Sequence, residues 1–547
     1  MTNAAIYFHP DGYDTSATRL MGRHSAGESF LRGLIRHAQA DAFYFFNASP
    51  TAPSRFQPLL DRIEPTAKPI HWIDRRERPR LATPGCLYHP TPGIANEAWL
   101  RRPFGSTTYS LTGITHTTAT HRVMDALVNM LTAPLEPWDA LICTSKAVND
   151  SVEVLLGAAR EDLTQRLGAT RFASPQLATI PLGVNTSDFA ADPAHRKAWR
   201  DKLDIPQDAV VALYVGRFSP AGKMNPAPMA LALEAAAQET GRDIYWIVSG
   251  WAGTPESSQA YHDQTKTFCP SIHYRSLDGR PAETRFSIWS AADLFISLPE
   301  NIQETFGLTP VEAMAAGLPC VVTDWDGYRD TVRDGIDGFR IPTTAPRPSL
   351  GRDLAYAHAN DWVNYDQYIS AAAAVTAIDL RAATQALVQL ITQPDLRRRM
   401  GEAALRQARQ VFDWATIIPQ YQALWGELAA RRTAATPTPN PNDNPRRLDP
   451  FKLYVGYPTQ ALTPQSIVSV VPGMSWAVAE ARLNSPLGNI GTWAMPFPPE
   501  RKAMFDFFQA NGPATVADMI ADATPRRRPF LERGVLWLVK FGILQLH

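Results

Sequence analysis

Residues 301–327, NIQETFGLTPVEAMAAGLPCVVTDWDG, join a helical pattern to a short apolar strand. The apolar run LFISL at 294–298 precedes this stretch, and PCVVTD at 319–324 closes the unit. Strand, helix and strand in this order are typical of parallel α/β architecture. In open parallel sheets the functional residues lie in loops after the strands, so we expect them in the loop between LFISL and the helix.

Two glutamates eight positions apart mark this loop and the following helix. Thr309 as N-cap, Pro310 at the first helical position and Glu312 at N3 match the capping-box arrangement, so Glu312 has a purely structural interpretation. Capping does not explain Glu304, which precedes the cap by five residues. Gly307 lets that segment bend close to the free amides of the helix start, where ligands bind.

The same alternation of strands and helices runs through most of the chain. Apolar runs at 4–9, 140–145 and 210–216 each precede a helical pattern, and further strands are expected at 243–250, 294–298 and 319–324. We therefore predict two Rossmann-like domains facing a cleft, at 1–190 and 191–432. Residues 433–449 contain four prolines and almost no apolar residues, which predicts a linker.

The tail at 450–547 is predicted to be a small accessory domain. Its last part, 500–547, shows a helix, a Gly-Pro turn, a short helix and a third helix that ends in a strand. This order predicts a winged-helix-like domain.

Composition limits the classes of partner. Lys plus Arg and Asp plus Glu are both 53, so no global field recruits nucleic acid or an acidic membrane. The four cysteines are scattered without metal-ligand spacing, which favours a reducing cytoplasm. The N-terminus lacks a signal-peptide pattern, and no window of 18 uninterrupted apolar residues predicts a transmembrane segment.

Basic residues follow the strand at 210–216. In YVGRFSPAGKMNP (214–226), Arg217 and Lys223 stand near the start of the next helix, where cations and helix amides hold phosphate well. The alternative is that both only solvate a loop. The segment lacks the GxxxxGK[ST] pattern, which argues against an ordinary ATPase.

Taken in order, these motifs resemble the retaining GT-B glycosyltransferases of family 4 (glycosyl transferases group 1). The resemblance covers residues 1–430 and includes GRHSAGESFLRGL (22–34), THTTAT (115–120), WDALICTS (138–145), IPLGVNTSDF (180–189), VGRFSPAGK (215–223), the E-x7-E segment and the closing helices at 401–425. It implies a hexosyltransferase that uses a nucleoside-diphosphate sugar.

The resemblance also implies roles for individual residues. Arg217 and Lys223 would bind the donor diphosphate, Glu312 the ribose hydroxyls and Glu304 a hydroxyl of the sugar. A carboxylate can accept two hydroxyl hydrogen bonds at once. Backbone amides at the helix start would hold the sugar and phosphate, offered by Phe306, Gly307, Leu308 and Thr309.

Two further residues come from the N-terminal domain. His116 resembles the family's histidine that faces the donor sugar across the cleft, although a lone histidine is more often structural. Gly27 resembles the loop glycine that lets backbone approach the diphosphate, with a simple helix-start turn as the alternative.

The sequence Asp324-Trp325-Asp326 is similar to Asp-x-Asp, the metal motif of the other large glycosyltransferase fold, GT-A. Two observations argue against a metal-binding function. The motif lies deep in the second α/β unit, and Arg217 and Lys223 can neutralise phosphates without a divalent ion. We therefore expect no metal and no cofactor. Asp330 stands where the family more often has a glutamate, which leaves the donor open.

The predicted function is transfer of a hexose to a saccharide or lipid-linked acceptor, in cell-surface polysaccharide synthesis, at a cytoplasmic location or the inner face of the membrane. Residues 450–547 would bind a protein partner or self-associate. The alternative is a sugar-nucleotide-sensing DNA-binding regulator that uses Arg526, Arg527, Arg528 and Arg533. Residues 500–547 contain seven basic and five acidic residues, a small excess of positive charge for a nucleic-acid-binding surface.

Overall fold

The computed structural model describes residues 3–14, 22–173, 175–436 and 444–547. The chain divides into two compact units, Met1–Asn444 and Pro445–His547. Most of the proline-rich segment predicted as a linker, 437–443, lies outside the described residues. The helices of the first unit end with α16 at Ala434.

The N-half of the first unit (residues 3–184) contains a parallel sheet in the order β3-β2-β1-β4-β5-β6-β7. Its strands are β1 (Ala5–Phe8), β2 (Phe43–Asn47), β3 (Ile70–Asp74), β4 (Cys86–His89), β5 (Ser110–Ile114), β6 (Ala140–Cys143) and β7 (Gln176–Thr179). Helices between them are α1 (Gly22–His37), α2 (Gln57–Ile63), α3 (Ile94–Arg101), α4 (His121–Val128) and α5 (Lys146–Leu167), with short 3-10 turns at 10–12, 53–56, 78–82, 102–104 and 129–131.

The C-half (residues 185–412) contains a second parallel sheet in the order β10-β9-β8-β11-β12-β13. Its strands are β8 (Val210–Arg217), β9 (Ile244–Trp251), β10 (His273–Asp278), β11 (Leu294–Ser297), β12 (Cys320–Thr323) and β13 (Gly338–Ile341), and a small antiparallel pair joins β14 (Thr343–Thr344) to β15 (Ala377–Ile378). The strands predicted within 140–145, 210–216, 243–250, 294–298 and 319–324 are confirmed.

Helices cover the second sheet. They are α6 (Pro193–Lys202), α7 (Ala227–Thr240), α8 (Pro255–Lys266), α9 (Ala282–Ser287), α10 (Leu308–Ala315), α11 (Tyr328–Thr331), α12 (Arg352–Ala359), α13 (Tyr365–Ala374), α14 (Leu380–Thr392) and α15 (Pro394–Gln407), with 3-10 turns at 186–189 and 288–291. Every residue of β11 and β12 is buried, as expected for strands covered on both faces.

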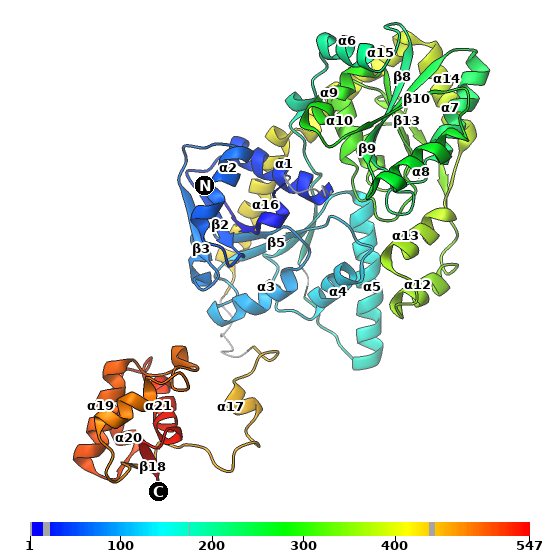
Figure 1. Cartoon of the computed structure of the whole chain (residues 1–547). Helices are drawn as coiled ribbons and strands as arrows, with labels where there is room; N and C mark the ends of the chain where they lie inside the picture. The colour runs from blue at the N-terminus through cyan, green and yellow to red at the C-terminus, as the bar shows by residue number, and fades with distance from the viewer. Residues whose placement is uncertain (1–2, 15–21, 174, 437–443) are drawn as a thin grey trace. The chain divides into compact units, whose positions relative to one another are not determined.

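The chain crosses between the two halves twice, and the two crossings lie side by side. The Val184 amide donates to the Phe412 carbonyl (2.9 Å), and the Trp414 amide donates to the Val184 carbonyl (3.1 Å). A π-helical turn at Ala408–Phe412 leads into α16 (Trp414–Ala434). Helix α16 then packs on α1 and β5 of the N-half (Figure 1). The Trp414 indole donates to Ser29 Oγ at 2.7 Å.

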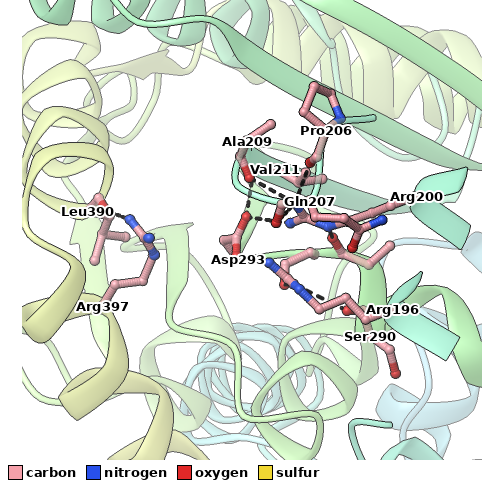
Figure 2. A network of polar contacts seen from close by, with 12 residues as sticks. Arg196, Arg200, Pro206, Gln207, Ala209, Val211, Ser290, Asp293, Leu390 and Arg397 are labelled. Atoms are coloured by element: carbon pink, nitrogen blue, oxygen red, sulfur yellow. Dashed lines mark hydrogen bonds and ion pairs between the residues drawn. The ribbon is translucent and has the colours of Figure 1, made fainter. Parts of the chain in front are cut away.

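A buried polar network fixes α6 to the amino-terminal ends of β8 and β11, the central strands of the second sheet (Figure 2). The fully buried Arg200 guanidinium donates to Asp293 at 2.8 Å and to the backbone carbonyls of Pro206, Gln207, Ala209 and Ala291. Asp293 also accepts from Arg196 and from the Val211 amide at the start of β8, both at 2.8 Å. The network pairs each buried charge, which makes its burial tolerable.

The second unit has its own apolar core, which includes Val468, Phe505, Val535 and Leu538. Its elements are α17 (Pro450–Leu453), β16 (Ile467–Val470), α18 (Trp476–Leu483), α19 (Pro498–Asn511), β17 (Ala514–Thr515), α20 (Val516–Met519), α21 (Arg528–Lys540) and β18 (Leu544–Leu546), with a 3-10 turn at 492–494. The three predicted helices and the final strand are confirmed. Strand β16 lies between β17 and β18 in an antiparallel sheet, and the winged-helix assignment stays a prediction.

Within the described ranges, no helix combines the length and apolar composition that a bilayer crossing requires.

Candidate functional site

The loops that follow β8 and β11 meet at the point where the strand order of the second sheet reverses. Strands β8 and β11 are neighbours although three helices and two strands separate them in sequence. Lys223 in the first loop forms an ion pair with Glu304 in the second. Their side chains are only 18% and 14% exposed. Crevices at such reversal points are where open α/β sheets bind ligands.

Burial and pairing oppose each other at this ion pair. Burial disfavours the charged form of Glu304, but Lys223 and the backbone amides of Thr305 and Phe306 outweigh it and lower the pKa of the carboxyl. Burial likewise opposes the charge of Lys223, but the charge of Glu304 raises the pKa of the ammonium. Both groups are therefore ionised at neutral pH.

Side-chain amides hold the Lys223 loop in place. Asn301 Nδ2 donates to the Ala221 carbonyl at 2.7 Å, and Gln303 Nε2 donates to the Gly222 carbonyl at 2.9 Å. Arg217, at the end of β8, donates to the same Gly222 carbonyl at 3.1 Å. The structure thus brings together Arg217 and Lys223, two residues predicted to bind the sugar-nucleotide donor. The loop that carries Glu304 holds their loop in place through hydrogen bonds.

Glu300, which sequence reasoning missed, contacts the backbone at Asn225, near the end of this loop. It is 4% exposed, and its Oε1 accepts from the Asn225 amide at 2.9 Å. Its second oxygen is buried and accepts no hydrogen bond within the described residues. Burial raises the pKa of this carboxyl to about 7. The only sequence signal was a glutamate two residues beyond an apolar strand.

Helix α10 begins at Leu308, one residue before the predicted cap, which corrects the capping-box interpretation. Gly307 is the N-cap at φ 86°, and a β-carbon there would collide with the ring of Tyr328. Because glycine allows this left-handed start, Thr309 falls inside the first turn and makes no N-cap bond to the backbone. Glu312 therefore stands beyond N3 and does not form a capping box.

Glu312 instead lines a small cavity of about 80 Å³ between the halves of the first unit. Leu308, Arg285 and Phe286 of the C-half line the same cavity, with Glu28 and Arg32 of α1 among its N-half residues. Burial raises the pKa of Glu312 to about 7, although the charges of Arg285 and Lys223 oppose the shift. This carboxyl can accept hydrogen bonds from a ligand.

Phe306 belongs to the Glu304 loop, and the backbone of His116 contacts this loop. The Phe306 side chain is 1% exposed and packs against Phe412, while its amide serves the Glu304 carboxylate. Thr305 Oγ1 donates to the His116 carbonyl at 3.0 Å. The N-half segment that contains His116 therefore contacts the residue next to Glu304.

Gly27 lies within α1 rather than in a loop, which corrects the predicted glycine loop at this position. A β-carbon at Gly27 would collide with the Gly12 carbonyl, so glycine here lets the turn after β1 approach the helix. Its neighbour Glu28 lines the small cavity beside Glu312. Residues 15–21, which precede α1, lie outside the described residues.

A larger cavity of about 620 Å³, here called the junction cavity, also lies between the two halves. It is lined by Thr118, Ala119, Met124, Leu127, Ala147, Val148, Ser151, Leu155, Ile302, Glu304, Asp324, Trp325, Asp326, Arg329, Thr343 and Ala345. Glu304 thus connects the ion pair with Lys223 to this space.

Asp324 and Asp326 have different surroundings. Asp324 Oδ1 lies 3.5 Å from the guanidinium groups of both Arg329 and Arg340. Asp326 Oδ2 is buried and has no hydrogen-bond partner in the described part of the chain. Among residues 3–14, 22–173, 175–436 and 444–547, no cluster of three or more histidine, cysteine, aspartate or glutamate side chains fits a metal ion.

Part of the chain is similar in sequence to known glycosyltransferases. Residues 195–373 match the model of the family described as Glycosyl transferases group 1. The D-inositol 3-phosphate glycosyltransferase of Corynebacterium aurimucosum is 26% identical over 291 residues, covering 52% of this chain and 59% of the relative. The enzyme of the same name from Geodermatophilus obscurus is 28% identical over 278 residues, covering 47% and 50%. The chain thus spans between half and three fifths of these relatives.

One solved structure shows the fold. Anabaena HepE, crystallised with UDP and glucose, aligns with a TM-score of 0.50 and 15% identity, over 78% of this chain and 100% of its own. The predicted α/β fold of two GT-B-like domains is confirmed at this level.

Proposed function

We propose that this chain is a retaining glycosyltransferase that moves a hexose from a nucleoside-diphosphate sugar to a saccharide or glycolipid acceptor. The observation that carries the proposal is the family match over 195–373, a segment that contains Arg217, Lys223, Glu304 and Glu312. The GT-B-like fold supports it. A role in cell-surface polysaccharide synthesis, a cytoplasmic location and a partner for residues 450–547 stay predictions. Nothing in the comparisons favours the DNA-binding alternative.

The proposed roles follow from charge and position. Lys223 and Arg217 hold the donor diphosphate, while Glu304 accepts a hydrogen bond from a sugar hydroxyl and Glu312 from the ribose. When the diphosphate binds, Lys223 exchanges part of its pairing with Glu304 for phosphate oxygens, which frees a carboxylate oxygen for the sugar. Preorganised charges of this kind act mainly by positioning and by stabilising the transition state.

The proposed transfer step needs no covalent intermediate on the protein. The acceptor hydroxyl oxygen forms a bond to the anomeric carbon on the face from which the phosphate leaves. The bond between that carbon and the phosphate oxygen breaks, and the hydroxyl proton passes to the leaving phosphate. The proposed reaction uses no metal ion, so activity should survive EDTA.

The test is a panel of UDP-, GDP-, ADP- and dTDP-sugars, scored by thermal stabilisation and by donor hydrolysis. A ligand at a hundred times its dissociation constant adds about 2.7 kcal/mol to stability. Glu304→Gln should lower turnover at least tenfold, or about 1.4 kcal/mol, and leave nucleotide affinity nearly unchanged.

Glu402→Gln, on the exposed face of α15, is the matched control and should turn over at the parent rate. Parent-rate transfer by Glu304→Gln would remove that residue from the mechanism. A panel in which no sugar nucleotide stabilises the protein or is hydrolysed would overturn the proposed function itself.

A further inference from the structure

A pair of helices leaves the C-half and returns to it at the same place. Thr343 and Thr344 of β14 pair with Ile378 and Ala377 of β15, so the residues between these two strands form a closed excursion. This excursion, residues 345–376, carries α12 and α13 and is here called the helical strap (Figure 1). Its contacts with the rest of the first unit reach both halves.

The helical strap contacts the N-half through packed rings. His358 on α12 packs against His121 at the start of α4 and against Tyr368 on α13, with ring centroids 3.6 and 4.2 Å apart. His358 is only 6% exposed. Burial and the nearby His121 lower the pKa of the His358 imidazole, so this ring is neutral at pH 7 and packs without charge repulsion. The strap is therefore anchored on the N-half.

The helical strap contacts the candidate site through Tyr365, the first residue of α13. The Tyr365 hydroxyl donates to Gln303 Oε1 at 3.2 Å, and Gln303 Nε2 donates to the Gly222 carbonyl at 2.9 Å. A carbonyl can only accept, so the amide nitrogen of Gln303 must face Gly222 and its amide oxygen must face Tyr365. The three residues therefore form one hydrogen-bonded series from the strap to the loop after β8.

This series ends at a carbonyl that also accepts from Arg217. Gly222 directly precedes Lys223, and Arg217 donates to the Gly222 carbonyl at 3.1 Å. The next residue of the strap lies against the same loop, because a β-carbon built on Gly222 would be 4.0 Å from Asp366 Oδ1. A shift of the Gly222 carbonyl would thus move the backbone from which the Lys223 side chain extends.

The Tyr365 hydroxyl is a hydrogen-bond donor at neutral pH. Burial raises its pKa, and the Thr117 side chain and the charge of Arg217 only partly oppose the rise. Packing alone does not explain this hydroxyl, because a phenylalanine ring would fill nearly the same space. The hydrogen bond to Gln303 is therefore the feature that distinguishes tyrosine at this position.

On the basis of the proposed function, we propose that Tyr365 is a positioning residue of the donor site, which holds the Lys223 loop, through Gln303, in the geometry that binds the donor diphosphate. Tyr365 touches no donor atom in this role. Its effect reaches the diphosphate only through Gln303 and the Gly222 carbonyl. The hydroxyl therefore matters for the binding of a nucleoside diphosphate and not for the binding of the nucleoside alone.

The test is titration calorimetry of the full chain with UDP, GDP, ADP and dTDP and with their nucleosides. Tyr365→Phe should weaken binding of the diphosphate that the parent binds at least threefold, while nucleoside affinity and the unfolding midpoint stay at their parent values. Parent affinity for the diphosphate, or an equal loss for both ligands, would overturn the inference alone. A parent protein that binds none of these diphosphates would overturn the proposed function with it.

A double-mutant cycle tests whether the effect passes through Gln303. Gln303→Met keeps the length of the side chain and removes both of its hydrogen bonds, so in this background Tyr365→Phe should weaken diphosphate binding by less than about 1.5-fold. A further threefold loss would refute the route through Gln303. Tyr368→Phe is the matched control, because Tyr368 lies on the same helix and packs on His358 rather than on Gln303. It should bind both ligands as the parent does.

Discussion

Replacing Glu300 with glutamine should stabilise the protein at alkaline pH. Glu300 supports the loop that carries Lys223, yet only its Oε1 has a hydrogen-bond donor, the Asn225 amide at 2.9 Å. Glutamine keeps an acceptor oxygen for that amide and has no charge to desolvate. The variant therefore isolates the cost of ionising a buried carboxyl.

The magnitude follows from the pKa of Glu300, which burial raises from 4.5 to about 7. Each pKa unit corresponds to about 1.36 kcal/mol, so full ionisation costs the folded state about 3 kcal/mol. Between these two pKa values the folded protein binds a proton that the unfolded chain has lost. Stability therefore falls as pH rises from about 4.5 to about 7, and the loss is complete above that range.

Urea unfolding at pH 5, 6.5 and 8, followed by tryptophan fluorescence, measures this difference. Glu300→Gln should exceed the parent by less than about 1 kcal/mol at pH 5 and by up to about 3 kcal/mol at pH 8. Glu239→Gln, an exposed position on α7, should track the parent throughout. A constant offset between Glu300→Gln and the parent at all three pH values would refute the reasoning, as would a less stable variant at pH 8.

Three further predictions concern the donor site and the tail. Lys223→Ala and Arg217→Ala should each weaken the binding of a nucleoside diphosphate at least tenfold, measured by calorimetry, while the affinity for the nucleoside stays unchanged. Equal losses of affinity for both ligands would indicate a misplaced site. Parent affinity for the nucleoside should rise with pH through about 7, as the Glu312 carboxyl ionises, and Glu312→Gln should abolish that rise; a flat parent profile would contradict the ribose role. A chain that ends at residue 436 should fold and hydrolyse donor, because the first unit has its own contacts up to α16, and insolubility would show that residues 445–547 complete its core.

The sheets and their loops were predictable because apolar period and turn residues report on local structure. The strands at 294–297 and 320–323 follow from short, mostly apolar runs, and their parallel pairing follows from the helix between them. The convergence of Lys223 and Glu304 was predictable for the same reason, since both follow strand ends at one edge of one sheet.

Other features depend on tertiary contacts that no local pattern encodes. Helix α10 starts at Leu308 because Gly307 adopts φ 86° against Tyr328, whereas the Thr-Pro-x-Glu pattern favoured a later start. The buried Oδ2 of Asp326 has no hydrogen-bond partner among the described residues, a tertiary property that the metal-like motif in the sequence does not encode. Helix α16 is amphipathic in sequence, but its pattern does not say that it packs on α1.

The paired crossings at Val184 and Phe412 have a mechanical consequence. Thr186 strengthens this point, because its amide and hydroxyl donate to Asp413 at 3.1 and 2.5 Å. Two covalent connections tied together at one place act as a hinge, since the halves can rotate about that point but cannot slide past each other. Such a rotation would separate His116 from Thr305 while the Lys223–Glu304 pair, held within the C-half, stayed intact. Opening for product release would thus leave the residues proposed to bind phosphate assembled for the next donor.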